Sequence, residues 1–391
     1  MSSATASGQR PSYDLSALRA RIPMLRASIP MNACSQGPQM LDTRDAANAF
    51  LDSWATRGMD WEAWIGEVMR AKSVFARLIG ASDDEIAVTS SVSEATSSIA
   101  SAIDFSGTRR NVAVTRAEFP SVGHIWLAQE KRGARVRWID ERNGILSLDD
   151  YERVIDDDTA LVSATSAYFL NGFKQDLAAI ATIAHAHGAL LSVDAYQSLG
   201  TAPLDVKALG VDILASGVLK FLMGTAGIAF LYVRRELVER LEPTITGWFG
   251  RVNPFGFGVS TLDWAKEARR FETGTPPLVN AYIARAGMEV IEACGLASVG
   301  DWNTILSRRL VDGGRARGLT LHGTDDSARK APTTAFLCDD SHAVEQRMRE
   351  RGVIASARGP VMRLAPHFYS TLDDCDRALD ALVASVEDQA R

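Results

Sequence analysis

The chain has 391 residues, of which 46% are hydrophobic, and a formal net charge of −6. This composition predicts a large core, and the lack of a basic cluster interleaved with aromatic residues argues against nucleic acid or an anionic membrane as a partner. No apolar run approaches membrane-spanning length and the opening residues MSSATASGQRPSYD lack a hydrophobic signal core, so we expect a flexible tail and a cytoplasmic protein.

The part of the chain that follows this tail is predicted to be helical. Apolar spacing favours a short amphipathic helix over residues 15–25, and a Gly-Pro loop that contains Cys34 follows over residues 29–38. A helical pattern then extends from Thr43 to Ile79. We assign residues 1–30 to an N-terminal tail and helix.

Short apolar runs alternate with helical periods from Glu85 onward. The predicted strands are residues 86–89, 112–115, 136–139, 161–165, 190–193, 211–215 and 228–233. Helices are expected from Ser90, from Val122 with Ser121 as its cap, and over residues 176–187. This alternation predicts an α/β fold with a mostly parallel, seven-stranded sheet covered by helices on both faces.

The alternation ends before a loop rich in glycine and aromatic residues, which spans residues 246–260. A long helix over residues 278–293 is expected to link two domains, and the last amphipathic helix covers residues 373–387. We therefore predict a large domain over residues 31–277. The linking helix and a smaller α/β domain occupy residues 278–391.

Lys220 lies in a very hydrophobic stretch, VDILASGVLKFLMGTAGIAFLYV (211–233). A lysine between two buried strands is costly unless it is paired, neutralised or used covalently. One interpretation is a lysine whose stem follows the apolar surface while its amine reaches water. The other is a Schiff-base lysine, whose amine becomes nucleophilic through desolvation.

Two further features favour the second interpretation. Asp194 follows the predicted strand 190–193, where a carboxylate suits a salt bridge to a pyridinium nitrogen, although an aspartate there is also common as a helix cap. The Ser90–Glu94 loop joins a strand to a helix, so its N–H groups and hydroxyls suit a phosphate, with a plain serine N-cap as the alternative. Ligands of parallel sheets bind at the carboxyl ends of the strands, where all three features are expected to lie.

Four motifs together resemble a known family. They are VDAYQSLG (193–200), SGVLKFLMGTAGIAFLYV (216–233), RRFETGT (269–275) and MRLAPHFYSTLDDCD (362–376). In this order they resemble the class V aminotransferase family of fold-type I pyridoxal-phosphate enzymes, which includes cysteine desulfurases, selenocysteine lyases, kynureninases and isopenicillin N epimerase-like proteins. The resemblance extends from about Asn32 to the C-terminal helix. The Arg-x-x-Pro-His-Phe-Tyr signature is similar to the branch with epimerase-like and ergothioneine-type C–S lyase enzymes.

The resemblance implies a pyridoxal 5'-phosphate cofactor and a homodimer with composite active sites. Lys220 would bind the cofactor and move the substrate Cα proton, and Asp194 would pair with the pyridinium nitrogen. Arg363 would grip the substrate carboxylate, for which guanidinium geometry is suited. The other implied cofactor contacts are Gln197 to the phenolic oxygen, Phe119 to the ring, Val92, Ser93 and Ser216 to the phosphate, and Thr275 to the phosphate of the neighbouring subunit.

The sequence departs from the family pattern at three places. Leu219 precedes the lysine where many members have a histidine, and Phe119 follows Glu118 where many members stack a histidine on the cofactor. Residues 350–362 lack the cysteine that forms a persulfide in desulfurases. These departures argue against desulfuration.

Four cysteines, at positions 34, 294, 338 and 375, are widely scattered and show no metal-ligand spacing. We therefore expect free thiols and no metal site. Cys34 either packs in the core or contacts the substrate. Trp248, in the aromatic loop, is predicted to line the substrate side-chain pocket.

We expect an enzyme that binds an α-amino acid as an external aldimine and removes its Cα proton. β-Elimination from a cysteine-type thioether, a C–S lyase reaction, is the preferred outcome, and transamination or epimerisation of an amino acid is the alternative. A non-catalytic protein that uses the same scaffold for binding is a rival of another class, against which the retained Lys220, Asp194 and Arg363 argue. A nicotinamide-binding enzyme is disfavoured because no Gly-x-Gly-x-x-Gly follows the first strand.

Overall fold

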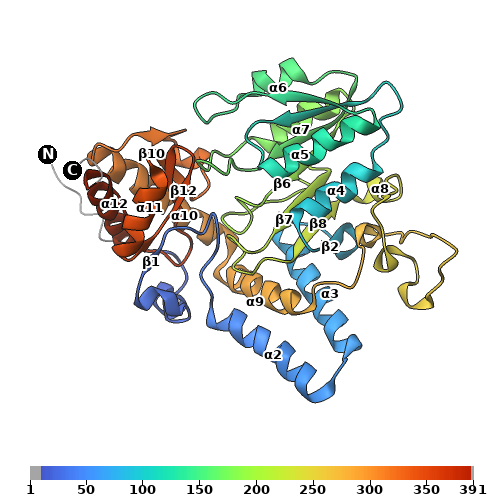
Figure 1. Ribbon diagram of the computed structural model, residues 1–391, viewed down its shortest axis with the longest axis horizontal. Helices are drawn as coiled ribbons and strands as arrows, with labels where there is room; N and C mark the ends of the chain where they lie inside the picture. Colours follow the sequence, from blue (N-terminus) through green and yellow to red (C-terminus); the bar gives the residue numbers. More distant parts are fainter. Residues whose placement is uncertain (1–9, 389–391) are drawn as a thin grey trace.

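A seven-stranded sheet lies at the centre of the computed structural model, which describes residues 10–388 (Figure 1). The strand order is β2-β8-β7-β6-β5-β3-β4, and only β8 runs antiparallel to its neighbours. The strands are β2 (Ile86–Thr89), β3 (Asn111–Thr115), β4 (Arg135–Ile139), β5 (Thr159–Thr165), β6 (Leu190–Asp194), β7 (Ile213–Gly217) and β8 (Ala229–Val233). The predicted α/β fold with a mostly parallel sheet is confirmed. The predicted tail lies largely outside the described residues.

Both faces of this sheet are buried, as the near-continuous apolar strands require. Leu161 and Leu231 belong to the hydrophobic cluster on one face, whereas their chain neighbours Val162 and Phe230 belong to the cluster on the other. Helices cover the sheet: α4 (Val92–Ala102), α5 (Pro120–Ala128), α6 (Leu148–Val154), α7 (Leu177–Ala186) and α8 (Arg235–Val238). The predicted cap Ser121 is wrong, because Phe119 is the N-cap of α5 and Pro120 takes the first helical position, where its missing N–H costs nothing.

Two helices rather than one continuous pattern occupy the region from Thr43 to Ile79. They are α2 (Leu41–Arg57) and α3 (Trp61–Leu78), and they separate at Gly58, whose φ of 64° favours glycine. The long helix α9 (Leu278–Cys294) packs against both of them.

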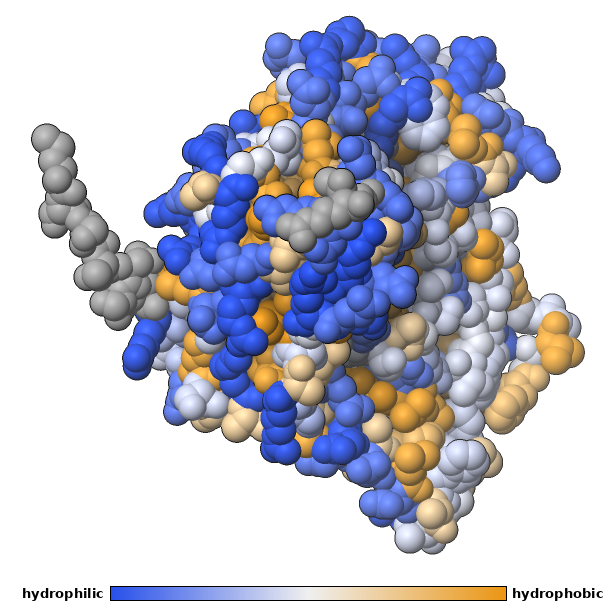
Figure 2. All heavy atoms as spheres, turned by 60° about the vertical axis from the view of Figure 1, so that its left-hand side comes forward, coloured by the Kyte–Doolittle hydropathy of each residue, from blue (hydrophilic) through white to orange (hydrophobic). Residues whose placement is uncertain are grey.

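A second, four-stranded antiparallel sheet forms the C-terminal part of the chain, in the order β12-β13-β10-β9. The elements of this part of the chain are α10 (Leu296–Ala316), β9 (Leu321–His322), β10 (Thr334–Leu337), α11 (Ser341–Glu350), β11 (Val353–Ile354), β12 (Ser356–Arg358), β13 (Val361–Leu364) and α12 (Leu372–Glu387). The sequence predicted a smaller α/β domain here but not each of its strands, because strands of two to four residues leave little periodicity. The face of the molecule formed by this part is largely hydrophilic (Figure 2).

The N-terminal segment joins the C-terminal part rather than the central sheet. After α1 (Leu15–Ala20), strand β1 (Ile29–Pro30) pairs with β11 in parallel. Met31 is fully buried in the hydrophobic cluster of the C-terminal part. We propose that the chain divides near residue 278, as the sequence suggested, with the segment around β1 belonging to the smaller part.

Single turns of 3-10 helix complete the described chain: η1 (Pro23–Arg26), η2 (Asp83–Glu85), η3 (Gln129–Arg132), η4 (Trp248–Gly250), η5 (Pro254–Gly256), η6 (Ala268–Phe271) and η7 (Ser327–Arg329). Within residues 10–388 no helix combines the length and the apolar character needed to cross a membrane.

Candidate active site

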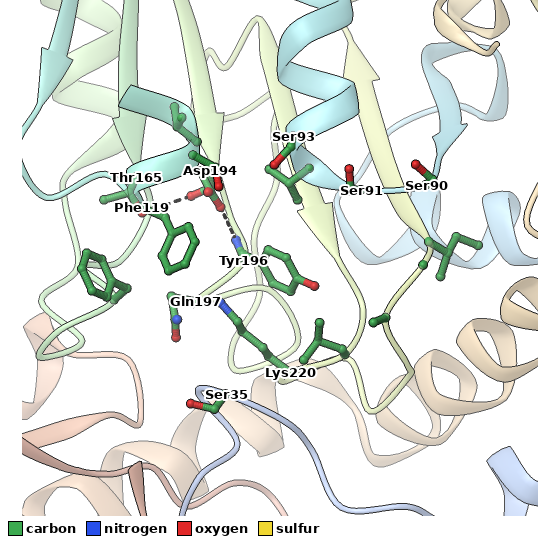
Figure 3. Close-up of a pocket in the computed structure, with 18 residues that line it drawn as sticks. Ser35, Ser90, Ser91, Ser93, Phe119, Thr165, Asp194, Tyr196, Gln197 and Lys220 are labelled. Carbon is green, nitrogen blue, oxygen red and sulfur yellow. Dashed lines mark hydrogen bonds between the residues drawn. The ribbon is translucent and has the colours of Figure 1, made fainter. Parts of the chain in front are cut away.

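A cavity of about 290 Å³ opens at the carboxyl edge of the central sheet (Figure 3). Strands β5 and β6 end at its wall with Thr165 and Asp194, and the first turns of α4 and α5 close it from the side. Six of the residues to which the sequence assigned a role line this cavity: Val92, Ser93, Phe119, Asp194, Gln197 and Lys220.

Lys220 lies three residues beyond the end of β7 (Ile213–Gly217). Its Nζ lies 4.1 Å from the centroid of the Tyr196 ring and 5.6 Å from that of Phe119. Figure 3 shows the amine pointing between Tyr196 and Gln197. Burial lowers the pKa of the Lys220 amine, and the nearby Asp194 carboxylate opposes this effect. The amine therefore faces the cavity and is easier to deprotonate than an exposed lysine.

Asp194 ends β6, and its Oδ1 accepts the backbone N–H of Tyr196 at 2.8 Å. No helix begins within the next residues, so Asp194 is not a helix cap. Burial raises the pKa of this carboxyl, while the Tyr196 N–H and the charge of Lys220 act in the opposite direction. A cation placed in the cavity would stabilise the carboxylate form.

The loop between β2 and α4 contains the predicted serine N-cap and leaves phosphate binding as a prediction. Ser91 is the N-cap of α4 and its side chain accepts the N–H of Glu94. Glu94 in turn accepts the N–H of Ser90 at 2.7 Å. Val92 and Ser93 are the first two residues of the helix, and N–H groups in a first helical turn have no intrahelical acceptor. These two groups adjoin the cavity at the positive end of the helix dipole, which suits an anion.

Arg363 lies on β13 and is only 1% exposed. Its Nη1 donates to the Phe169 carbonyl at 2.7 Å, and its Nη2 donates to the hydroxyls of Ser356 at 2.7 Å and Ser35 at 3.0 Å. Phe169 and Ser35 both line the cavity. The guanidinium therefore lies directly behind the cavity wall and reaches it past the Ser35 hydroxyl.

Besides Arg363, four residues named from the sequence do not line this cavity within one chain. Ser216 is buried in β7, where its hydroxyl donates to the Gly217 carbonyl. Cys34 is buried against Phe221, one residue away from the cavity residue Ser35. Trp248 packs among aromatic side chains and Thr275 is exposed on the surface.

Sequence reasoning missed two of the residues that shape the site. Tyr196 stands between Asp194 and Gln197 in the sequence, and its ring lies beside the Lys220 amine. A Cβ on Gly217 would lie 2.3 Å from the Tyr196 hydroxyl, so the glycine before the lysine makes room for this ring. The position of Tyr196 two residues after Asp194 could have indicated that it lies at the site. Ser35 gave none, because only the fold brings it to Arg363.

The histidine of the C-terminal signature supports the lysine segment. His367 is fully buried, and its Nε2–H donates to the Phe221 carbonyl at 2.8 Å. Burial lowers the pKa of His367 to about 3, so the ring is neutral and can act as this donor. The signature therefore joins the smaller part of the chain to the residue that follows Lys220.

These observations define a cavity with an amine, a buried carboxylate and an anion-binding helix end on a mostly parallel sheet. Residues 48–364 match the family described as aminotransferase class-V, and the chain belongs to this family. An uncharacterized aminotransferase YcbU from Bacillus subtilis is 36% identical over 94% of this chain and 96% of its own length. A kynureninase from Pseudomonas fluorescens is 27% identical over 88% of this chain and 83% of its own.

Solved structures share the fold. The apo cysteine desulfurase from Thermococcus onnurineus NA1 has a TM-score of 0.86 and 22% identity, covering 97% of this chain and 99% of that one. The cystine C–S lyase C-DES has a TM-score of 0.85 and 19% identity, covering 93% and 99%.

The protein is a pyridoxal-phosphate-dependent enzyme. The residues present fit this cofactor. Asp194 is a carboxylate for which no cation is within ion-pair distance in the described chain, and Gln197 Oε1 is buried there without a hydrogen-bond partner. The carboxylate can pair with a cationic ring nitrogen, and the Gln197 oxygen can accept a hydrogen bond from a ring hydroxyl.

Proposed function

We propose that the enzyme catalyses β-elimination from a cysteine-type thioether. In the net reaction, the thioether and one water yield a thiol, pyruvate and ammonium. The Cα–H and Cβ–S bonds break, and the thiolate leaves with the electron pair of the Cβ–S bond. The observation that carries this proposal is a cavity that holds one amine, that of Lys220, and no thiol.

The cofactor would be held by residues of this chain on three sides. Asp194 would pair with the ring nitrogen, Phe119 would cover the ring, and the amide of Gln197 would bind the phenolic oxygen. The N–H groups of Val92 and Ser93 would hold the phosphate, with Ser216 behind them in β7. When bound, the cofactor withdraws electrons from the substrate Cα, which makes its proton acidic.

Lys220 is proposed to move that proton. The titratable residues that line the cavity are Asp194, Tyr196 and Lys220, and none is a histidine. The pKa of Tyr196 is raised by burial, so its hydroxyl stays protonated, and Asp194 would be paired with the cofactor ring. Burial lowers the pKa of Lys220, so more of its amine is neutral near pH 7 and available to act as the general base.

Arg363 is proposed to bind the substrate carboxylate. The Ser35 hydroxyl both lines the cavity and accepts from Arg363, so a carboxylate that takes its place would meet the same guanidinium N–H. The carboxylate would then take a charge-assisted hydrogen bond from the buried guanidinium. The amino acid would then be fixed with its Cα towards Lys220.

The positions of the thiols favour elimination over desulfuration. Residues 350–362, which precede Arg363 and include β12, contain no cysteine. Cys338 and Cys375 are buried in the smaller part, and Cys34 is 1% exposed. Elimination needs no enzyme thiol, because the substrate thiolate is released into solution and is not transferred to a cysteine.

We also propose a homodimer, in which Thr275 serves the neighbouring subunit's site. Thr275 does not cap the following helix, because Pro277 is the N-cap of α9. The loop beside it exposes large apolar residues, among them Phe257 at 72% and Val259 at 100%. A partner subunit would cover this surface. Light scattering that gives the mass of one chain would rule out the dimer.

Product analysis tests the proposed reaction. The purified holoenzyme should release pyruvate and ammonium in equal amounts from S-alkyl or S-aryl cysteine conjugates, together with the free thiol. A double variant with Cys338 and Cys375 replaced by alanine should keep this activity, as a control for persulfide chemistry. Elemental sulfur transfer from free cysteine that depends on one of these thiols would overturn the proposal.

Transamination is the second candidate, because the 36% identical relative carries the name of an aminotransferase. The same cavity could bind an amino acid and return its amino group to a keto acid. The product assay separates the two reactions. A new amino acid formed from an added keto acid, without pyruvate from any cysteine conjugate, would establish transamination.

A further inference from the structure

A second buried carboxyl group, that of Glu118, lies behind the cavity. Its side chain is 6% exposed and belongs to the residue before Phe119. Oε1 accepts the Ser163 hydroxyl at 3.0 Å, whereas Oε2 is buried and has no hydrogen-bond partner among residues 10–388. A buried acid without a cationic partner is costly in its ionised form, and the proposed reaction gives it no task.

The strand register places Glu118 close to Asp194. In the parallel ladder of β5 and β6, Ser163 pairs with Ser192, and Thr165 pairs with Asp194. Residues two apart point to the same face of a strand, so the side chains of Ser163 and Asp194 share one face of the sheet. Glu118 is hydrogen-bonded to Ser163 and therefore lies two residue pairs away from Asp194 along the ladder, on the same face.

The other charged groups near this pair are few. Lys220 faces Asp194 from the end of β7, and Tyr151 on α6 faces Glu118. The Tyr151 hydroxyl is engaged by Gln175 and its pKa is raised by burial, so it stays neutral. The pKa of Glu118 is itself raised well above its usual range, first by burial and then by the charge of Asp194.

Two adjacent carboxyl groups in a buried site do not both ionise. Asp194 has the N–H of Tyr196 and the charge of Lys220 to stabilise its anion, whereas Glu118 has a single neutral hydroxyl. We propose that Glu118 is a positioning residue that keeps its proton, so that Asp194 carries the only negative charge of the pair. The neutral acid then keeps its hydrogen bond from the Ser163 hydroxyl and adds no second negative charge beside Asp194. This inference rests on the proposed role of Asp194 toward the cofactor ring.

Two variants test the inference on cofactor binding. Glu118→Gln mimics the protonated acid, and Glu118→Met keeps the length of the side chain without a hydrogen-bonding group. We expect Glu118→Gln to bind pyridoxal 5'-phosphate within about threefold of the wild-type affinity near neutral pH, and Glu118→Met to bind it about tenfold or more weakly. The position of the visible absorbance band should follow the same order. Weak binding by Glu118→Gln, or wild-type binding by Glu118→Met, would overturn the inference.

The stability of the apo protein provides a readout without cofactor. A carboxyl whose pKa is raised in the folded state stabilises the fold at low pH, and this contribution is lost as the pH rises from the unfolded pKa towards the folded one. The melting temperature of Glu118→Gln minus that of the wild type should therefore increase as the pH rises above the ordinary glutamate pKa. A difference independent of pH would mean that Glu118 is ionised, against the inference. This measurement remains decisive if Glu118→Met fails to fold.

Glu272 offers a matched control. It is a buried carboxyl that accepts the Val88 N–H at 3.0 Å, and burial raises its pKa to about 7. In Glu272→Gln the stability difference should therefore stop growing near pH 7. The absorbance band of its bound cofactor should stay as in the wild type. Asp194→Asn separates the two hypotheses: an unchanged affinity and band would remove the cofactor role of Asp194, while the apo measurement would still report on Glu118.

Discussion

Buried carboxylates at the two ends of the parallel strands differ in how many partners they have within the chain. At the edge opposite the cavity, Asp212 precedes β7 and is fully buried. It forms an ion pair with Arg234 at 2.9 Å, contacts His185 Nε2 at 2.8 Å, and accepts the N–H of Leu191 at 2.7 Å. At the cavity edge, Asp194 has one backbone N–H and Glu118 one hydroxyl.

This difference indicates that Asp212 stabilises the folded chain, whereas Asp194 can bind a ligand. Asp212 is paired within the chain, so its removal should act on stability. Asp194 has few hydrogen-bond partners, so a cation that enters the cavity would form an ion pair with its carboxylate. Variants at the two edges should therefore change different measured quantities.

The largest effect is expected at the cavity edge, from Lys220→Ala. Without the amine, neither covalent attachment of the cofactor nor proton removal has a substitute among the lining residues, so turnover should fall by about 10³-fold or more. Borohydride reduction followed by peptide mapping should label Lys220 in the wild type and nothing in the variant. A reducible cofactor bond that persists in Lys220→Ala would contradict this role.

Asp194→Asn should have the next largest effect. The amide keeps the shape of the side chain but cannot hold the ring nitrogen protonated, so turnover should drop by about 10²- to 10³-fold while some cofactor remains bound. Steady-state kinetics and the absorbance of the bound cofactor measure the two effects separately. Turnover near the wild-type level would count decisively against the proposed pairing.

Asp212→Asn should have the smallest effect, and it should act on stability alone. The charge-assisted contacts to Arg234 and His185 weaken, which should lower the free energy of unfolding by about 2 to 3 kcal/mol, because both partners are partly exposed and can turn to water. Chemical denaturation measures this loss. If the folded variant instead lost cofactor affinity, the division between the two edges would be mistaken.

The sequence predicted the central sheet well because its strands carry their own signal. Residues 86–89 form β2 with the predicted bounds, and Asp194 ends β6 at the predicted edge. The hydrophobic runs are long enough to define strands, and the order of elements fixes where their carboxyl ends meet. Lys220, Asp194 and the loop before α4 were therefore brought together without knowledge of any distance.

Other features depend on contacts that no local pattern contains. Strand β1 has two residues and exists only because β11 lies beside it. The hydrogen bonds of Arg363 to Ser35 and Phe169 join segments far apart in the chain. The start of α5 was placed wrongly because Ser121 was preferred as a cap over the stronger signal of Pro120.

The pairing of β1 with β11 has a consequence for synthesis on the ribosome. Ser35 forms part of the cavity wall, yet its segment is held by strands near the other end of the chain, through Asn32 beside Ala365 and the Ser35 contact with Ser356. The central sheet can be complete before those late residues emerge, because domains fold as units during translation. The nascent enzyme therefore leaves the Ser35 loop undocked until residues 353–365 have been made, so its cavity wall is completed after the central sheet.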